Sequence, residues 1–459
     1  MSIDRSFGST KDDSVLATSK LDHGRFVMLA SIGALAGLVV PSLGALTQPL
    51  LVLVFLGIVV SLATAVIRRR FVYAWALMAF MCAIEPVFRL HASVLPYFAV
   101  EYVQLGSSVV IIVLQRPRKG ASMQVALAYG IYLVLEVVGS VWADNFEEAR
   151  SVVLPSVLMF VYMLSARRTR LSPVGVTFIL ASYITGAVTT MGFAVRAYLF
   201  GTIAWQTTSN SVASGGMPPN HVSVLMSVAV FACILLAEDA SRFHRLVILG
   251  VATILGAFMV LTFSRGGTVI LFLALIFYYV VLRSVSRRTV FTILAVAVAG
   301  LLISYGTHQL TGGIVADRYS EANTTNRLTI ATQGWDIFKD NALIGVGTSN
   351  FHNEISEREF GRQTGAHNEL IRAAAEHGAF GLVVWLWFLS TAFFYALRGV
   401  DTTRARRGLR VVLLIFATIS MFYNGLKLAV QPMLVLLALS AFTADDAPPK
   451  LSNRARGRD

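Results

Sequence analysis

The sequence predicts an all-α polytopic integral membrane protein with about 12–14 transmembrane helices and one large, partly helical loop on the outer side. Three observations support this class. Hydrophobic residue types make up 56% of the 459 residues, charged types only 14%, and the mean hydropathy is +0.69. Soluble domains average roughly half apolar and a quarter charged residues. The composition therefore excludes a water-soluble globular protein.

Apolar runs of transmembrane length recur along the chain. A helix that crosses a hydrocarbon core of about 30 Å needs about 20 mainly apolar residues. The stretch 411–444 is too long for one crossing, and Asn424, Gly425 and Pro432 offer a break, so two short helices are predicted there. The other spans are predicted at 26–42, 48–67, 71–89, 96–115, 121–142, 149–166, 173–195, 221–237, 246–263, 268–284, 289–306 and 379–397.

These spans divide the chain into five parts. We expect a cytoplasmic N-terminal tail at 1–25, a transmembrane bundle at 26–306, a large outer loop at 307–378, C-terminal transmembrane helices at 379–444 and a basic cytoplasmic tail at 445–459. Residues 1–25 are polar and lack the apolar core of a signal peptide. The loop 307–378 is too long for a simple connector, so the catalytic residues are expected there.

The basic residues predict the orientation. The 38 Lys and Arg residues exceed the 25 acidic residues and give a net charge of +13. In a soluble protein this excess favours nucleic-acid binding. Here the bases cluster at every second loop, as at 68–70, 167–170 and 450–458. The positive-inside rule then places both termini in the cytoplasm, and no nucleic-acid partner is expected.

A few ionisable residues lie within or at the ends of predicted spans, where charges are costly and usually functional. With the orientation above, each falls in the outer half of its helix or at its outer mouth, which favours a site that opens to one side. Interfacial side chains and structural ion pairs remain the alternative. These residues are Glu85, Arg89, Glu101, Glu136, Arg196, Arg265 and Lys427.

The segment 262–267 separates two apolar helices at the outer surface and contains Ser264, Arg265 and two glycines. Arg265 cannot lose its proton, and glycine lets a ligand approach the backbone. A fixed cation at such a turn suits an anionic group, phosphate most of all. The alternative is an interfacial arginine without a ligand.

A second segment begins at Arg327. A short amphipathic helix, lying on the membrane surface or against the bundle, is predicted by the spacing of Leu328, Ala331, Trp335 and Phe338. Arg327 lies at the helix start, where a cation opposes the helix dipole. This small cost favours a ligand-binding role over a plain surface position. Gly345 and Gly347 follow as a weak phosphate-loop signal.

A third segment, 366–378, predicts a helix that ends at Gly378. His367 is expected in the first turn, where the helix dipole keeps the imidazole neutral. A neutral imidazole is what a general base needs. Asn368 and Glu369 are candidates to orient the ring, and a hydrogen-bonded interfacial histidine is the alternative.

Asn220 and His221 lie at the mouth of another helix, where substrate contact is one interpretation and a plain helix start the other. No HExxH pattern, Cys–His spacing or acidic triplet predicts a metal. No Walker A or dinucleotide motif predicts a nucleotide. The sequence therefore predicts no cofactor.

Taken in order, three motif groups resemble the bacterial O-antigen ligase and O-antigen (exopolysaccharide) polymerase superfamily. The resemblance covers about residues 262–390, and the segment 215–220 fits more loosely. The groups are Ser264-Arg265-Gly266, Arg327 with Trp335 and 343–347, and 366–369 with 376–378 and Gly381.

The resemblance implies a metal-independent glycosyltransferase of the inner membrane, with its active site at the periplasmic face. The donor would be a glycan on undecaprenyl diphosphate, and the acceptor lipid A–core for a ligase or the next repeat unit for a polymerase. Arg265 and Arg327 would bind the diphosphate, and His367 would activate the acceptor hydroxyl, with inversion at the sugar carbon. Supporting roles fall to Ser264, Asn368, Glu369, Arg196, Asn220 and His221.

Ligase and polymerase are not separated by these motifs. A function of another class, a lipid-linked glycan flippase or other polytopic transporter, would also use many spans and buried charges. Such a protein commonly shows paired halves with related hydropathy. The sequence shows no such duplication.

Overall fold

The computed structural model describes residues 23–117, 123–200, 212–279, 287–320, 325–355, 365–398 and 404–442. The tails predicted at 1–25 and 445–459 lie outside these residues, apart from 23–25, which begin the first helix.

The described chain is almost entirely helical. Its first half forms α1 (His23–Val39), α2 (Thr47–Ile67), α3 (Phe71–His91), α4 (Ala99–Leu114), α5 (Met123–Gly139), α6 (Phe146–Ala166), β1 (Arg170–Leu171), α7 (Pro173–Phe200) and α8 (Pro219–Asp239). Its second half forms α9 (Arg242–Leu261), α10 (Arg265–Phe277), α11 (Arg287–Thr311), α12 (Ile314–Ser320), α13 (Thr325–Asp340), α14 (Phe351–Ile355), α15 (Glu369–Arg398), α16 (Arg404–Asn424), α17 (Val430–Leu439) and β2 (Ala441–Phe442). Short 3₁₀ helices occur at Val40–Leu46 and Ser140–Trp142.

Each predicted span overlaps a helix of the described chain, and residues 121–122, 280–284 and 443–444 of the predicted spans lie outside the described residues. Within the described residues, nine helical segments are long and apolar enough to cross a membrane, and the first of them, Ser31–Ile67, joins α1 to α2 through a 3₁₀ turn. Three shorter apolar helices, α4, α10 and α17, add to these. The predicted break in 411–444 is also present, because α16 ends at Asn424 and α17 begins at Val430. The predicted class, an all-α polytopic membrane protein, is confirmed.

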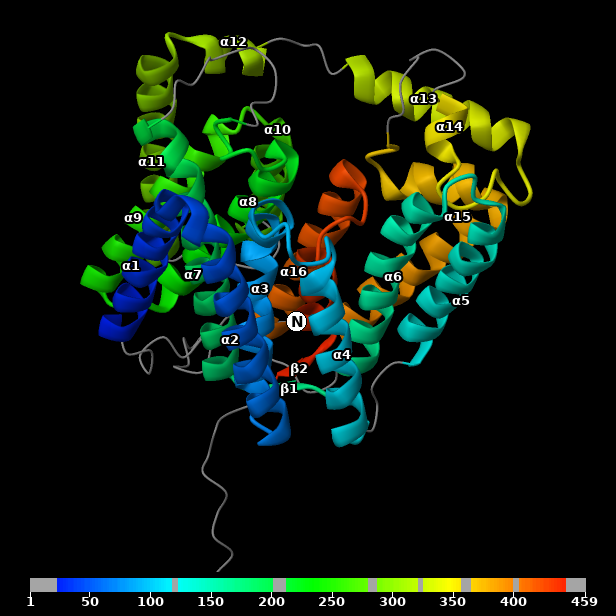
Figure 1. Ribbon diagram of the computed structural model, residues 1–459, viewed down its shortest axis with the longest axis horizontal. Helices are drawn as coiled ribbons and strands as arrows, with labels where there is room; N and C mark the ends of the chain where they lie inside the picture. The colour runs from blue at the N-terminus through cyan, green and yellow to red at the C-terminus, as the bar shows by residue number, and fades with distance from the viewer. Residues whose placement is uncertain are drawn as a thin grey trace, which may run out of the picture.

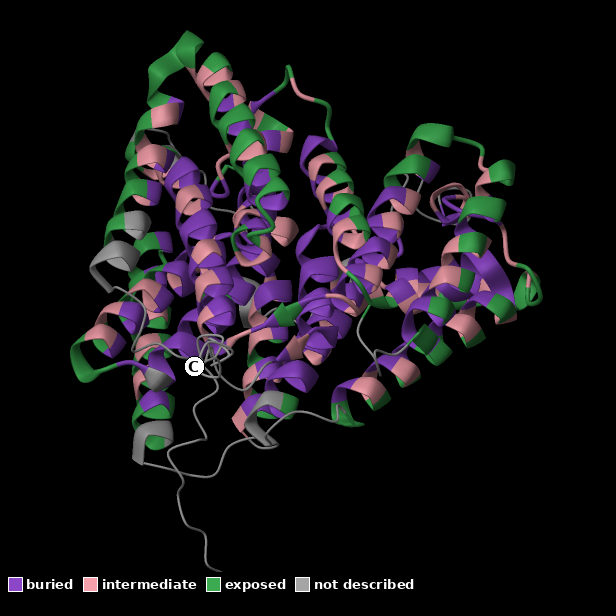
Figure 2. Ribbon diagram, turned by 90° about the horizontal axis from the view of Figure 1, so that it is seen from below, coloured by how far each residue is buried: buried purple, intermediate pink, exposed green. Residues whose placement is uncertain are grey.

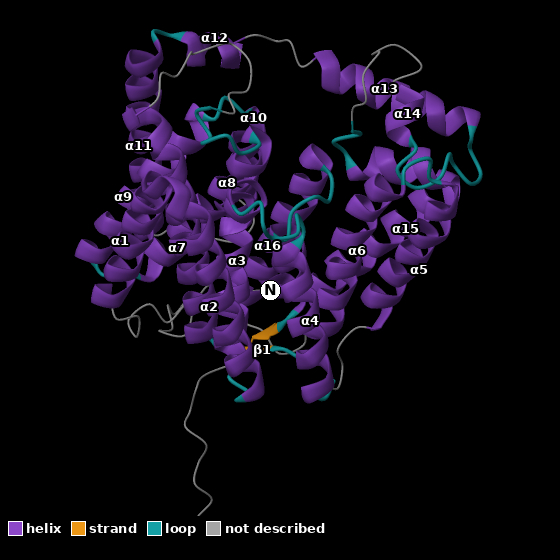
Figure 3. Cartoon of the chain, viewed as in Figure 1, coloured by secondary structure: helices purple, strands orange, loops and turns teal. Residues whose placement is uncertain are grey.

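The helices form one bundle with distinct ends (Figure 1). Helices α12, α13 and α14 lie at one end, and the two short strands lie toward the other (Figures 1 and 3). β1 and β2 pair in parallel, with Arg170 opposite Ala441 and Leu171 opposite Phe442. This pairing joins the basic segment after α6 to the chain after α17.

In Figure 2 the buried inner faces of the helices, drawn in purple, contrast with the exposed outer faces, drawn in green. Every residue of α17 is buried, which explains its uniform apolar sequence without helical periodicity. By contrast, α11 presents Leu301 with 71% of its surface exposed. Such exposed apolar side chains suit contact with lipid.

Helix α13 coincides with the predicted amphipathic helix. Ile330 and Ile337 are buried in a small separate core with Phe351, while Leu328 and Trp335 are exposed. Gly334 lies close to Ile371 of α15, so the helix packs against the bundle. The prediction left open whether the face of Leu328, Ala331, Trp335 and Phe338 lies on the membrane surface or against the bundle, and Leu328 and Trp335 do not lie in this core.

Two glycines allow the backbone of 343–347 to cross the backbone of α15. A Cβ atom at Gly345 would lie 2.3 Å from the carbonyl carbon of Glu376, and one at Gly378 2.4 Å from that of Leu343. Both glycines have positive φ, +69° and +63°. Val346 N donates to Ala375 O at 3.0 Å. The glycine spacing that resembled a phosphate loop therefore has a packing explanation, and the helix that begins at Glu369 breaks at Gly378 as predicted.

Candidate functional site

The first part of the site is the junction of α8 and α10. Ser264 precedes Arg265, the first residue of α10, and its Oγ donates to Asn220 Oδ1 at 2.8 Å. Ser223 Oγ donates to Ser264 O at 3.0 Å. A Cβ atom at Gly267 would lie 2.2 Å from Ser223 O. The glycines after Arg265 thus let two helix ends meet, and the predicted pair Ser264 and Asn220 is in direct contact.

Tyr423, in the last turn of α16, connects this junction to Arg327. The Arg327 guanidinium carbon lies 4.0 Å from the Tyr423 ring centroid, and Arg327 Nη1 donates to Tyr423 O at 3.0 Å. A Cβ atom at Gly266 would lie 2.6 Å from Tyr423 Cε1. One tyrosine thus contacts the residue after Arg265 and also Arg327. Sequence reasoning missed Tyr423, because a single aromatic residue near a helix end carries no pattern.

His367 lies immediately before α15 and not within its first turn. Asn368 is the N-terminal cap, and its Oδ1 accepts from Leu370 N at 3.0 Å. The φ angle of His367 is +48°, which is uncommon for a residue with a side chain and is typical of functional sites. Asn368 therefore caps the helix, and His367 precedes the first turn in which the sequence placed it.

Burial, together with the nearby charges of Lys427, Arg327 and His352, lowers the pKa of His367 to about 4. Burial and Lys427 also lower the pKa of His352. The imidazole of His367 is therefore neutral at ordinary pH, as the sequence predicted. The cause is burial beside cations more than the helix dipole.

Glu369 contacts groups other than His367. Its Oε2 accepts from Leu426 N at 3.0 Å, and its Oε1 forms an ion pair with Arg372. Glu369 therefore positions the turn between α16 and α17, which carries Lys427. The sequence suggested that Glu369 orients His367, whereas its contacts are with this turn and with Arg372.

A buried charge cluster lies beside the site, between α5 and α15. Arg372 forms ion pairs with Glu369, with Glu136 at 2.5 Å and with Glu376 at 3.0 Å. Tyr132 Oη lies 3.3 Å from Arg372 Nη2. Glu136, one of the charges expected at membrane depth, thus has a structural ion pair.

Replacing Arg372 with methionine is expected to destabilise the protein by about 3–5 kcal/mol, because several carboxylates would be left buried without their counter-ion. Thermal unfolding of the purified protein in detergent measures this. Arg150→Met is the matched control, because Arg150 pairs with Glu147 on the surface with 45% of its side chain exposed, and surface pairs contribute about 0–1 kcal/mol. Equal unfolding midpoints for both variants would contradict the structural role of Arg372.

The remaining predicted residues differ in their placement. His221 lies in the first turn of α8, where the charges of Arg89, Lys427 and His367 act on it. Arg196 is exposed near the end of α7, where its charge acts on His91. The structure thus groups His221 with His367, Arg327 and the Arg265 turn, and places Arg196 at the edge.

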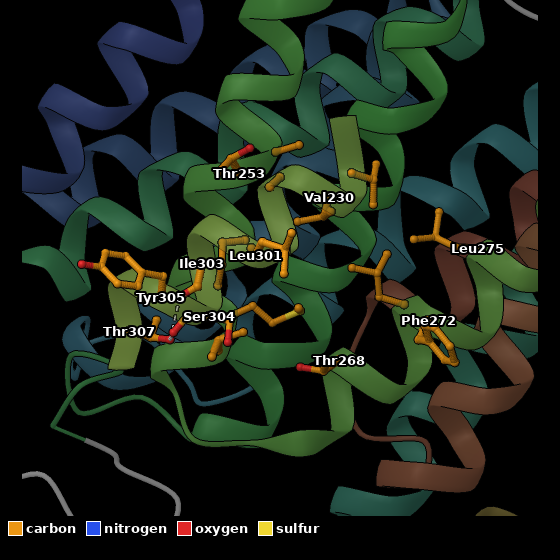
Figure 4. A pocket seen from close by; sticks show the side chains of 18 of the residues that line it. Val230, Thr253, Thr268, Phe272, Leu275, Leu301, Ile303, Ser304, Tyr305 and Thr307 are labelled. Carbon is orange, nitrogen blue, oxygen red and sulfur yellow. Dashed lines mark hydrogen bonds between the residues drawn. The ribbon is translucent and has the colours of Figure 1, made fainter. Parts of the chain in front are cut away.

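A large apolar cavity of about 770 Å³ opens between α8, α9, α10, α11 and α12 (Figure 4). Val230, Phe272 and Ile303 line it, and Thr268 lies at its wall one turn after Arg265. One end of the cavity therefore lies next to the turn that contains Arg265, called the arginine turn below. Among the described residues, no group of three or more His, Cys, Asp or Glu side chains is arranged to hold a metal ion.

Comparison with known proteins gives one match. Residues 249–386 match the family model described as O-antigen ligase. No curated protein and no solved structure matches the chain. The matched segment contains Arg265, Arg327 and His367, whereas His221, Tyr423 and Lys427 lie outside it. This multi-pass membrane protein is therefore similar to the O-antigen ligase family over residues 249–386, which confirms the predicted resemblance to the O-antigen ligase and polymerase superfamily.

Proposed function

We propose that this protein transfers a glycan from undecaprenyl diphosphate to a sugar hydroxyl of an acceptor glycan. The family match supports ligase-type chemistry in general, and the donor, the acceptor and the residue roles are our proposal. Arg265 and Arg327 bind the diphosphate, and His367 accepts the proton of the attacking hydroxyl. By this proposal the site faces the periplasm from the inner membrane.

The transfer is a single displacement. The acceptor oxygen bonds to the anomeric carbon of the donor sugar, the bond from that carbon to the diphosphate oxygen breaks, and the hydroxyl proton passes to His367. The configuration at the anomeric carbon inverts. The departing lipid diphosphate gains negative charge, which fixed guanidinium groups stabilise without a metal ion.

The observation that carries this proposal is the neutral histidine beside fixed cations. His367 has a pKa of about 4, and Arg327 is among the charges that lower it. A base must be neutral to accept a proton, while the leaving diphosphate needs positive charge nearby. A buried site that holds both kinds of group suits this reaction.

The apolar cavity beside Arg265 provides space for the lipid of the donor. Its walls come from α8 to α12 (Figure 4), and its volume of about 770 Å³ accommodates part of a polyprenyl chain. Thr268 places one end of the cavity a single helical turn from Arg265. A polyprenyl chain in the cavity would bring its diphosphate to the arginine turn.

The pH profile of transfer tests the role of His367. The base is active when neutral, which holds above its pKa, so kcat/KM is expected to stay constant through pH 5 and to fall below about pH 4. A histidine with the ordinary pKa of about 6.5 would lose activity two pH units earlier. Rates measured with purified protein, with unfolding followed at each pH, distinguish the two profiles. A midpoint near 6.5 would contradict the buried neutral base.

The acceptor distinguishes ligase from polymerase. Purified protein in lipid nanodiscs is supplied with a glycan on undecaprenyl diphosphate and either lipid A–core or a second lipid-linked repeat unit. Extension of lipid A–core identifies a ligase, and growth of the lipid-linked glycan identifies a polymerase. Transfer to neither acceptor would contradict the proposed function.

A further inference from the structure

The turn between α16 and α17 is fixed by side chains from several helices. Leu426 N donates to Glu369 Oε2 at 3.0 Å, and Ala429 N donates to Glu85 Oε2 at 3.0 Å. Gln431 Oε1 accepts from Leu428 N at 3.1 Å. These contacts hold the short segment 425–429 from both sides and fix the backbone of Lys427, which lies between them.

An ion-pair cluster supports the same turn from α3 and α4. Arg89 Nη2 donates to Lys427 O at 3.4 Å and forms ion pairs with Glu85, at 2.5 Å, and with Glu101. Glu85, Arg89 and Glu101 thus form one ion-pair cluster, and Arg89 and Glu85 also form hydrogen bonds with the backbone of the turn. The side chain of Lys427 is the charged group that this arrangement presents to the site.

The ammonium group of Lys427 lies among the histidines. A Cβ atom at Gly365 would be 3.0 Å from Lys427 Nζ and 3.3 Å from His352 Nε2, and Gly365 is two residues before His367. Among the residues that the structure describes, no carboxylate oxygen lies within 4.0 Å of Lys427 Nζ. Lys427 is partly buried, and a partly buried ammonium group without a close carboxylate is stabilised by an anion that neutralises it.

We infer that Lys427 is a third cation of the donor site and binds the diphosphate together with Arg327 and Arg265. The inference rests on the proposed function. The observation that supports it most directly is the position of Lys427 Nζ. The fixed turn places this atom beside the segment 365–367, and no carboxylate of the described residues lies close to it. The O-antigen ligase match ends at residue 386 and does not include this position.

The surrounding charges agree with an anion in this place. Burial lowers the pKa of Lys427, Arg372 lowers it further, and Glu369 and Glu376 partly offset this effect. Arg327, His352 and Lys427 all face His367. A bound diphosphate would neutralise this excess of positive charge and would leave His367 free to accept a proton.

The direct test uses inorganic pyrophosphate as a competitor of the donor. Wild-type protein is expected to be inhibited by pyrophosphate, and Lys427→Met is expected to raise both the inhibition constant and the donor KM by about 10- to 100-fold, the effect of losing one charge-assisted hydrogen bond. Lys427→Arg, which keeps the charge, is expected to recover most of the affinity. Lys339→Met is the control, because Lys339 pairs with Asp336 on the surface.

A second readout tests whether the charge of Lys427 lies beside His367. Without the charge of Lys427, the pKa of His367 is expected to rise toward its ordinary value, so the acid limb of kcat/KM should move to higher pH in Lys427→Met. An unchanged acid limb in folded Lys427→Met would place the ammonium group away from His367 and contradict the inference. If Lys427→Met fails to fold, Lys427→Gln provides the same loss of charge with a polar side chain.

The outcomes distinguish the inference from the proposed function. If pyrophosphate inhibits transfer by folded Lys427→Met as strongly as transfer by the wild type, the role of Lys427 is overturned. The proposed function then stays intact. No transfer by wild-type protein would overturn the proposed function. In that case weaker protection by pyrophosphate against thermal unfolding in Lys427→Met would still support a cationic site, and equal protection would reject it.

Discussion

Replacing His367 with alanine is expected to lower the rate of glycan transfer by about 10²–10⁴-fold, the usual contribution of a general base. The physical reason is that the acceptor hydroxyl would keep its proton while it attacks the donor sugar. The donor KM is expected to change little, because the cations that bind the diphosphate remain. Steady-state transfer by purified protein, with donor and acceptor varied separately, measures both quantities.

His244→Ala provides the matched control for this prediction. His244 lies in the first turn of α9 and contacts Ser241, away from the arginine turn. Transfer by this variant is expected to equal that of the wild type. Full activity of correctly folded His367→Ala would remove His367 as the base.

Replacing Arg327 with alanine is the second change with a large expected effect. Removing one fixed group that stabilises developing negative charge lowers kcat by about 10²–10³-fold. Arg327→Lys is expected to restore only part of this loss. A lysine lacks the planar fork that binds a diphosphate, and it stacks less well on the Tyr423 ring than the guanidinium does. Kinetics with the lipid-linked donor measure the loss.

Arg398 offers a control with the same kind of contact. Its guanidinium carbon lies 4.1 Å from the ring centroid of Phe394, near the far end of α15 from His367. Arg398→Ala therefore removes a cation–π contact without touching the site, and unchanged kinetics are expected. Equal donor dependence of Arg327→Ala and wild type would reject a diphosphate role for Arg327.

The positions of the helices could be predicted because membrane spans depend on composition over about 20 residues and not on contacts between distant segments. The break between α16 and α17 is an example. Gly425 has a φ of +70°, a conformation that glycine adopts readily, and the chain turns there as predicted. A buried helix such as α17 was recognised by its continuous apolar sequence.

Contacts between distant segments could not be predicted. Gly345 and Gly347 appeared in a spacing that suggests a phosphate loop, but Gly345 meets the backbone of Glu376. Tyr423 joins Arg327 to the turn of Arg265 across about a hundred residues of sequence, and nothing local marks it. A pairwise contact of this kind leaves no periodic pattern in a single chain.

The charges at membrane depth divide into two kinds, which the sequence alone left open. Glu85, Arg89 and Glu101 form one buried ion-pair cluster, and Glu136 pairs with Arg372. The first cluster fixes the backbone of the turn that carries Lys427, and the second includes Arg372, which pairs with Glu369. Lys427 differs, because its backbone is fixed by the first cluster while its ammonium group lies near His367.

The most direct test of the central claim is glycan transfer by purified protein in nanodiscs, supplied only with a glycan on undecaprenyl diphosphate and an acceptor. We predict that the wild type forms the product with or without a metal chelator, and that His367→Ala does so at least a hundredfold more slowly. Two results would contradict this account. One is loss of wild-type transfer on addition of the chelator. The other is a wild-type protein that moves the intact donor across a vesicle membrane without transferring its glycan.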